Sequence, residues 1–306
     1  MKKVSLGLLL TIIAAAVLAQ QKNITTTNEN TLLWKISGNG LAQPSYLFGT
    51  IHMLCADEAL LSDSLKKIIG RSEQVYMEVD MDNLFEMLGM MKQMKMRNDT
   101  TWADLLSAED YEKVKSYFEK QSSLMPFSMM ETFKPFLAAS LLMESGIQCS
   151  SAVAMEQVIM AEAKKNKKQI KGLETMASQM SIFDQIPYKL QAQQLVEYID
   201  KSEAGKTEDT KEYDELINAY REQDLKKLEE ITIRSDMGLA SFTDILLYNR
   251  NHNWVEKLKT LLPEKSLLIA VGAGHLPGEK GVINLLRKAG YTLTPIRNKV
   301  TITKEI

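Results

Sequence analysis

Short apolar runs alternate with longer amphipathic segments along this chain. Runs rich in β-branched or aromatic residues predict strands at residues 32–36, 45–48, 74–80, 168–173, 266–271 and 291–296. Apolar residues at helical spacing predict helices at about residues 60–69, 81–166, 176–262 and 279–289. Strands that alternate with helices indicate an α/β fold, with a mainly parallel sheet covered by helices on both faces.

The first two runs flank Ser37, Gly38, Asn39 and Gly40, which predicts an N-terminal antiparallel β-hairpin at the edge of the sheet. The stretch at about 81–166 is long and helical, so we expect it to be a helical insertion. Because no Pro/Gly/Ser-rich linker divides the chain, residues 31–306 are expected to form a single domain.

The N-terminus has the three parts of a secretory signal peptide over residues 1–19. Lys2 and Lys3 precede an apolar stretch, and small residues end it before Gln20. The stretch is shorter than the roughly 20 residues that a membrane span needs, so we expect no stable membrane anchor. Residues 20–30 are polar and predict a disordered lead-in. The sequence therefore predicts a periplasmic or secreted protein.

The charge of the chain limits the classes of partner that it can bind, and its cysteine content bears on whether a disulfide forms. The formal net charge is −2 with acids and bases interleaved, which argues against a nucleic-acid partner, and no feature specifies an oligomeric state. The two cysteines, Cys55 and Cys149, would enter an oxidising compartment on export, which favours one disulfide. A zinc ligand or nucleophile is the weaker alternative, since neither cysteine has CxxC spacing or an adjacent base.

Two of only three histidines stand in the same context, a glycine three residues before the histidine at the end of a predicted strand. These are Gly49 with His52 and Gly272 with His275. In open α/β sheets, ligands bind beyond the carboxyl ends of the strands, so two histidines placed there can meet although they are far apart in sequence. The alternative is that each is an ordinary hydrogen-bonded surface residue.

Two further predicted strands end in carboxylates, Glu78 and Glu174. Two imidazoles and one or two carboxylates are a ligand set that suits manganese, cobalt or zinc, with positions left for water and substrate. Such an ion lowers the pKa of bound water and polarises carbonyls, which predicts hydrolysis. Glu78 is the stronger candidate ligand and Glu174 a possible one, because the strand before Glu78 is more apolar.

Arg250 and the methionines each leave two interpretations open. Arg250 either lies in a polar turn between helices or binds a substrate carboxylate or carbonyl through its forked guanidinium. The methionines either fill a core or line a groove that accepts varied peptides; they are Met87, Met90, Met91, Met94 and Met96.

Several motifs, in order along the chain, resemble the TraB/GumN family, which includes the Tiki metalloproteases and is related to the erythromycin-esterase-like fold. The motifs are the sequence around Gly49–His52, the strand before Glu78, Gly172-Leu173-Glu174-Thr175, Arg250-Asn251 and Val271 to Gly278. The resemblance implies a metalloprotease-type site formed by His52, Glu78 and His275, with Arg250 matching the family's arginine.

The leading hypothesis is a periplasmic or secreted metal-dependent hydrolase of Tiki type that acts on a peptide or protein substrate. In it, His52, Glu78 and His275 hold a manganese, cobalt or zinc ion, and these three residues and Arg250 are catalytic. One alternative is a protein that sequesters a peptide without cleaving it. The other is an esterase-like hydrolase that uses a histidine as a general base without a metal.

Overall fold

The structure is a computed structural model that describes residues 30–120, 126–145, 149, 151–204, 208–234 and 242–300. The expected signal peptide, residues 1–19, and all but the last residue of the expected lead-in, 20–30, lie outside these ranges and stay predictions. Within the described ranges, no helix is both long enough and apolar enough to cross a membrane.

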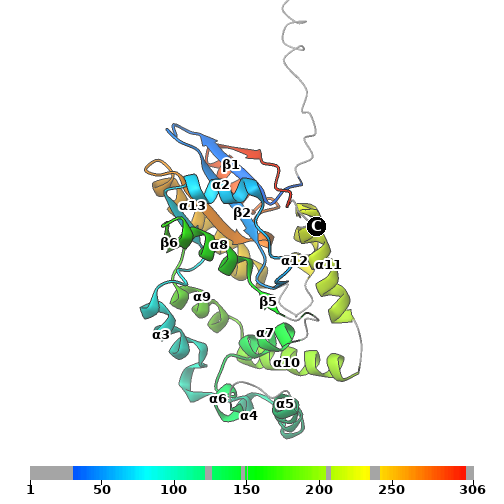
Figure 1. Ribbon diagram of the computed structural model, residues 1–306. Coiled ribbons are helices and arrows are strands. Elements are labelled where there is room, and N and C mark those ends of the chain that lie inside the picture. The colour runs from blue at the N-terminus through cyan, green and yellow to red at the C-terminus, as the bar shows by residue number, and fades with distance from the viewer. Residues whose placement is uncertain are drawn as a thin grey trace, which may run out of the picture.

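A six-stranded, mostly parallel sheet lies in the upper half of the molecule as drawn in Figure 1. Strand β7 pairs in parallel with β4 and with β2, and β4 pairs in parallel with β6. The prediction of an α/β fold with a mainly parallel sheet is therefore confirmed. In their order across the sheet, the strands are β6 (Gln169–Gly172), β4 (Gln74–Met77), β7 (Leu267–Gly272), β2 (Ser45–Thr50), β1 (Leu33–Gly38) and β8 (Tyr291–Pro295).

The N-terminal hairpin forms as predicted, with β1 antiparallel to β2. It is not the edge of the sheet, however, because β8 pairs antiparallel with the outer side of β1. A hairpin can be predicted from a local turn, whereas the pairing of Trp34 with Pro295 joins opposite ends of the chain. A second, two-stranded sheet joins β3 (Leu54–Cys55) to β5 (Ala152–Val153) in antiparallel fashion.

Helices cover both faces of the sheet, and the alternation of side chains along β7 shows the reason. Leu268 and Ala270 face one core, whereas Leu267, Ile269 and Val271 face the other. The first core is completed by α2 (Asp63–Arg71), α8 (Met155–Lys165), α11 (Glu208–Glu222) and α12 (Leu225–Arg234). The second core is completed by α13 (Asn249–Leu261) and α14 (Val282–Lys288).

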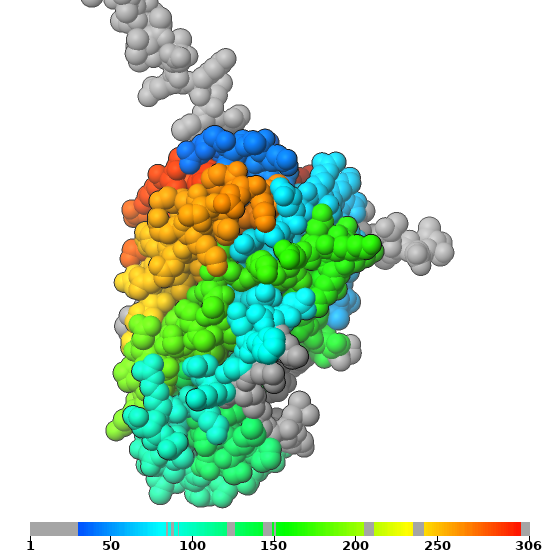
Figure 2. Space-filling view, turned by 90° about the vertical axis from the view of Figure 1, so that its left-hand side faces the viewer, coloured from blue at the N-terminus to red at the C-terminus, as the bar shows by residue number. Residues whose placement is uncertain are grey.

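The remaining helices form a lobe with its own core, which makes up the lower half of the molecule in Figures 1 and 2. Trp102 lies at the centre of this core, fully buried, and its indole N–H donates to the carbonyl oxygen of Phe133 at 2.8 Å. The elements are α3 (Leu84–Met94), η1 (Arg97–Asp99), α4 (Trp102–Leu105), α5 (Ala108–Lys120), α6 (Phe127–Met130), α7 (Pro135–Ser145), α9 (Met176–Ile182), η2 (Phe183–Gln185) and α10 (Tyr188–Glu203).

The lobe differs from the helical insertion expected at about 81–166. Helix α8 lies within that range but packs on the sheet through Met155 and Ile159. Helix α10 lies beyond the range but places Leu195 and Ile199 in the lobe core, and α9 packs against α3. Apolar spacing in the sequence identifies which face of a helix is buried but not the neighbour that buries it.

The methionine-rich stretch contributes to the lobe. Met96 is buried in the lobe core, and Met90 and Met94 are half-buried. The core interpretation therefore holds for Met96, while the side chains of Met87 and Met91 lie outside the described part of the structure.

Two glycines should respond oppositely to replacement by alanine. A Cβ at Gly281 would lie 1.8 Å from the carbonyl oxygen of Pro277, so the backbone must move, and we expect Gly281→Ala to cost roughly 1–3 kcal/mol. A Cβ at the helical Gly89 meets no atom within 4 Å, so Gly89→Ala should stabilise by up to about 1 kcal/mol. Urea unfolding of both variants tests this; a neutral effect of Gly281→Ala would contradict the tight loop after β7.

Candidate active site at the carboxyl edge of the sheet

The four residues predicted at strand ends lie in order along one edge of the sheet. Glu174, Glu78, His275 and His52 follow β6, β4, β7 and β2, which are successive neighbours in the sheet. The registers align these ends, since Met77 lies opposite Gly172 and Ala270, and Thr50 lies opposite Gly272. The sequence-based placement at one edge is therefore confirmed, while the roles of the residues as ligands stay predictions.

Arg250 joins three of these side chains. It lies in the first turn of α13, directly after the π-helical segment η4 (Asp244–Tyr248), and its side chain is only 11% exposed. Nη2 donates to Oε2 of Glu78 and to Oε1 of Glu174, both at 2.6 Å. Nη1 lies 3.2 Å from Nε2 of His275. The guanidinium therefore belongs to the site and not to a surface turn.

The contacts of His275 define its tautomer. The side-chain nitrogen of Asn251 donates to the carbonyl oxygen of Lys280 at 2.9 Å, so its oxygen faces Nδ1 of His275, 2.6 Å away. Arg250 can only donate, so Nε2 must accept from it. His275 therefore carries its proton on Nδ1 and has a lone pair on Nε2. Burial lowers the pKa of His275 to about 3, in agreement with a neutral ring.

Glu78 is buried but ionised. Its Oε1 accepts from the backbone N–H of Gly272 at 2.8 Å and lies 3.9 Å from Nε2 of His275, and its Oε2 accepts from Gln179 at 3.1 Å. Burial acts to raise the pKa of Glu78, but the charges of Arg250 and His52 and the N–H of Gly272 outweigh it and hold the pKa well below its usual range. His275 is neutral and adds no charge to this lowering.

His52 has a carboxylate partner that the sequence analysis missed. Glu156, in the first turn of α8, places Oε1 3.0 Å from Nδ1 of His52. The same oxygen accepts from the hydroxyl of Thr50 at 2.5 Å. Glu156 is 7% exposed and adjacent to buried Met155. A carboxylate beside the apolar face of an amphipathic helix was the sequence signal that could have identified it.

Glu156 raises the pKa of His52, although 70% of the His52 side chain is exposed and solvent weakens the pairing.

The side chains at this edge have nitrogen and oxygen donors of the kinds that bind divalent ions. These donors are not arranged around one common position. Among the described residues, no three His, Cys, Asp or Glu side chains form a ready-made metal cluster. The guanidinium of Arg250 bonds to both Glu78 and His275. The two imidazoles nevertheless share one feature of metal-bound histidines, since Nδ1 of each contacts an oxygen, although Nε2 of His275 contacts Arg250.

The sequence matches the profile of the TraB/PrgY/gumN family over residues 32–295, nearly the whole described chain. The chain belongs to this family. The resemblance inferred from its motifs is thereby confirmed. The match includes all of the residues placed above at the carboxyl edge of the sheet.

Curated relatives of this family member carry the name metalloprotease. A metalloprotease TIKI homolog of Nematostella vectensis is 23% identical over 88% of this chain and 68% of the relative. Metalloprotease TIKI1 of Danio rerio is 24% identical over 88% of this chain and 64% of its own length, and that of Homo sapiens is 23% identical over 86% and 61%. This chain thus spans 61% to 68% of these relatives. The comparison with solved structures gives no match.

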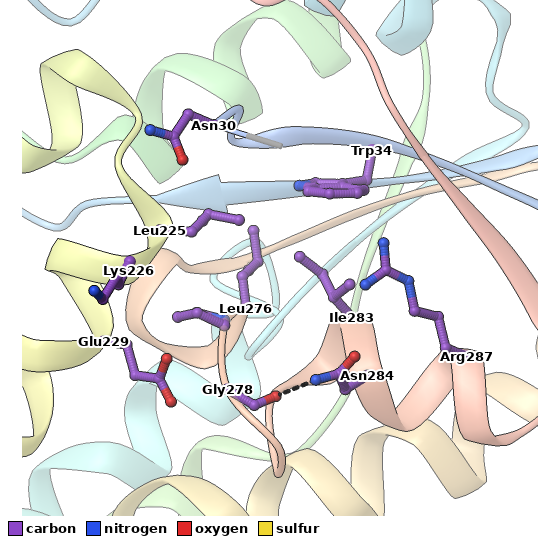
Figure 3. Close-up of a pocket in the computed structure, with 11 residues that line it drawn as sticks. Asn30, Trp34, Leu225, Lys226, Glu229, Leu276, Gly278, Ile283, Asn284 and Arg287 are labelled. Carbon is purple, nitrogen blue, oxygen red and sulfur yellow. Dashed lines mark hydrogen bonds between the residues drawn. The ribbon is translucent and has the colours of Figure 1, made fainter. Parts of the chain in front are cut away.

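A cavity of about 230 Å³ lies beside the loop that follows His275 (Figure 3). It is lined by the apolar side chains of Trp34, Leu276 and Ile283 and, on opposite sides of them, by Glu229 and Arg287. None of the four strand-end residues lines this cavity. It is therefore separate from the candidate active site.

Cys55 and Cys149 are not bonded to each other, but their thiols lie in hydrogen-bond contact. Interaction with Cys149 raises the pKa of Cys55 to about 11. The β3–β5 pairing brings the two segments together, because Cys55 lies opposite Ala152. The predicted disulfide stays a prediction, and the fold has already placed its two sulfurs side by side.

We expect oxidation to close this pair, because it would join segments nearly a hundred residues apart at little conformational cost. Mass spectrometry of the non-reduced exported protein should show the loss of two hydrogens, and Cys55→Ser should lower the melting temperature by about 5 °C or more. We also expect weaker metal binding, since Cys55 lies in β3, which directly follows the segment that carries His52. Two free thiols in the exported protein would contradict the prediction.

The neutral, buried His275 should make stability depend on pH. Its pKa falls from 6.5 to about 3 on folding, so the unfolded chain binds the extra proton between these values. The stabilisation is fully present above pH 6.5 and is lost as the pH falls toward 3. Between pH 6.5 and 4.5, the free energy of unfolding of the metal-free wild-type protein should fall by as much as about 2 kcal/mol more than that of the metal-free His275→Gln variant. Urea unfolding at both values measures this; equal losses would refute it.

Proposed function

We propose that this protein is an exported metal-dependent hydrolase that cleaves peptide bonds. The observation that carries the proposal is the neutral His275, whose Nε2 lone pair lies beside the buried, ionised Glu78. A buried histidine and carboxylate at the carboxyl edge of a parallel sheet are suited to binding a cation and a substrate. The metalloprotease names of the curated relatives support the same reaction class.

His52, Glu78 and His275 are the proposed ligands of a manganese, cobalt or zinc ion, and Glu174 is the possible fourth. A divalent ion bound here would supply Lewis acidity toward a carbonyl oxygen and lower the pKa of a water molecule. Nε2 of His275 has one lone pair, which cannot serve both Arg250 and an ion. The bond from Nη1 of Arg250 to His275 must therefore open, while two bonds to Glu174 hold the guanidinium in place.

Arg250 then has the role of binding the substrate. A guanidinium fixed by a buried carboxylate is preorganised to stabilise negative charge that develops on a carbonyl oxygen. The ring of Trp254, 4.7 Å from the guanidinium carbon, supports the same orientation. The catalytic residues are thus His52, Glu78, Arg250 and His275.

Each alternative function is favoured by one observation. Metal-independent hydrolysis is favoured by the existing contact of Arg250 with His275, which provides a neutral base beside a cation. Peptide sequestration is favoured by Phe85, which is 86% exposed at the start of the methionine-rich helix α3. A chelator separates the first alternative from the proposal, and an assay for cleaved products separates the second.

The test is peptide cleavage by purified protein, stripped with a chelator and reloaded with manganese, cobalt or zinc. We expect one ion to restore activity, and Glu78→Gln and His275→Ala to lose at least 100-fold in kcat/KM. Glu256→Gln, on the same helix as Arg250 but 69% exposed, is the matched control and should retain activity.

Full activity in the stripped protein would support the metal-independent alternative instead. Peptide binding without any product, in protein that is fully loaded with metal, would support sequestration.

A further inference from the structure

Glu156 is a buried carboxylate in which only one of the two oxygens has a hydrogen-bond partner among the described residues. Its Oε1 accepts from Thr50 and contacts His52, but its Oε2 is buried and has no hydrogen-bond partner within the described part of the chain. Burying an ionised oxygen without a partner costs free energy, and an apolar residue would serve helix packing at no such cost. A role confined to packing α8 on the sheet therefore does not account for this side chain.

The backbone around Glu156 fixes it relative to His52. The N–H of Met155 donates to the carbonyl oxygen of Ile51 at 3.1 Å, so the start of α8 is bonded to the residue before His52. On the other side of the carboxylate, Thr50 belongs to β2 and donates to Oε1. The carboxylate is thus held from both the strand and the helix and is directed at Nδ1 of His52.

The physical effect on the imidazole is specific. A carboxylate can only accept, so it requires a proton on Nδ1 of His52. In the neutral ring this places the lone pair on Nε2, as the oxygen of Asn251 does in His275. The two histidines of the repeated motif are therefore oriented in the same way, by partners on two different helices, α8 and α13.

We infer that Glu156 is a positioning residue that fixes the tautomer and orientation of His52, so that Nε2 is presented to the ion. This inference rests on the proposed function. Partners of this kind typically contribute 10- to 100-fold to metal affinity. Because 70% of the His52 side chain is exposed, few other contacts restrain the ring, and Glu156 provides the main restraint.

The experiment compares Glu156→Gln with Glu162→Gln. Glu162 lies on the same helix and accepts from Asn166, away from His52, so it is a matched control. Calorimetric titration with Mn²⁺ or Zn²⁺ should show a 10- to 100-fold loss of affinity in Glu156→Gln and no change in Glu162→Gln. Thermal unfolding of the metal-free proteins establishes that both variants fold.

A second measurement does not depend on metal. Imidazole ¹⁵N shifts of metal-free protein, recorded with the ring neutral, should show His52 protonated on Nδ1 in the wild type. In Glu156→Gln they should show a mixture, since an amide can donate or accept at this position. The His275 signals should stay unchanged. If Glu156→Gln does not fold, Glu156→Asp, which withdraws the carboxylate by one methylene, takes its place in both measurements.

The two measurements separate the outcomes. A folded Glu156→Gln with wild-type metal affinity and an unchanged His52 tautomer overturns the inference. If the wild type binds no ion, the proposed function fails, and the ¹⁵N shifts alone decide whether Glu156 orients His52.

Discussion

The parallel pairing of β7 with β4 on one side and β2 on the other is the constraint on which the site depends. Parallel neighbours end at the same edge, so segments that are distant in sequence are brought together wherever these three strands stop. The same pairing buries β7 on both faces, which requires its uninterrupted apolar sequence. The stability of the sheet and the assembly of the site thus have one origin.

Arg250 links the two carboxylates at this edge of the sheet. The side chains of Glu78 and Glu174 are 9% and 12% exposed, and these two carboxylates would repel each other without Arg250, which donates to both at 2.6 Å. Because Arg250 also contacts the lone pair of His275, the guanidinium bonds to groups that an ion would bind. Under the proposed function, a metal ion would therefore compete with this arginine for Glu78 and His275.

The helical lobe is connected to this edge through its first and last segments. Helix α3 begins soon after Glu78, and α9 begins directly after Glu174 and Thr175. Gln179 of α9 donates to Glu78, and Glu86 of α3 accepts from the N–H of Met176. The lobe is thus bonded to a carboxylate of the site, and a shift of α9 would change the hydrogen bonding of Glu78 directly.

The sequence by itself determined the class of fold and the position of most candidate site residues at strand ends, because the signals for both are local. Apolar runs identify strands and their ends, and His52, Glu78, Glu174 and His275 are adjacent to those ends. Only the tertiary structure decided how those residues are paired. Glu156 and Gln179 lie on helices whose sequence shows an apolar face but not its neighbour, so their contacts with His52 and Glu78 could not be predicted. The position of β8 beside β1 and the division of helices between sheet and lobe have the same cause, since each depends on contacts between residues far apart in the chain.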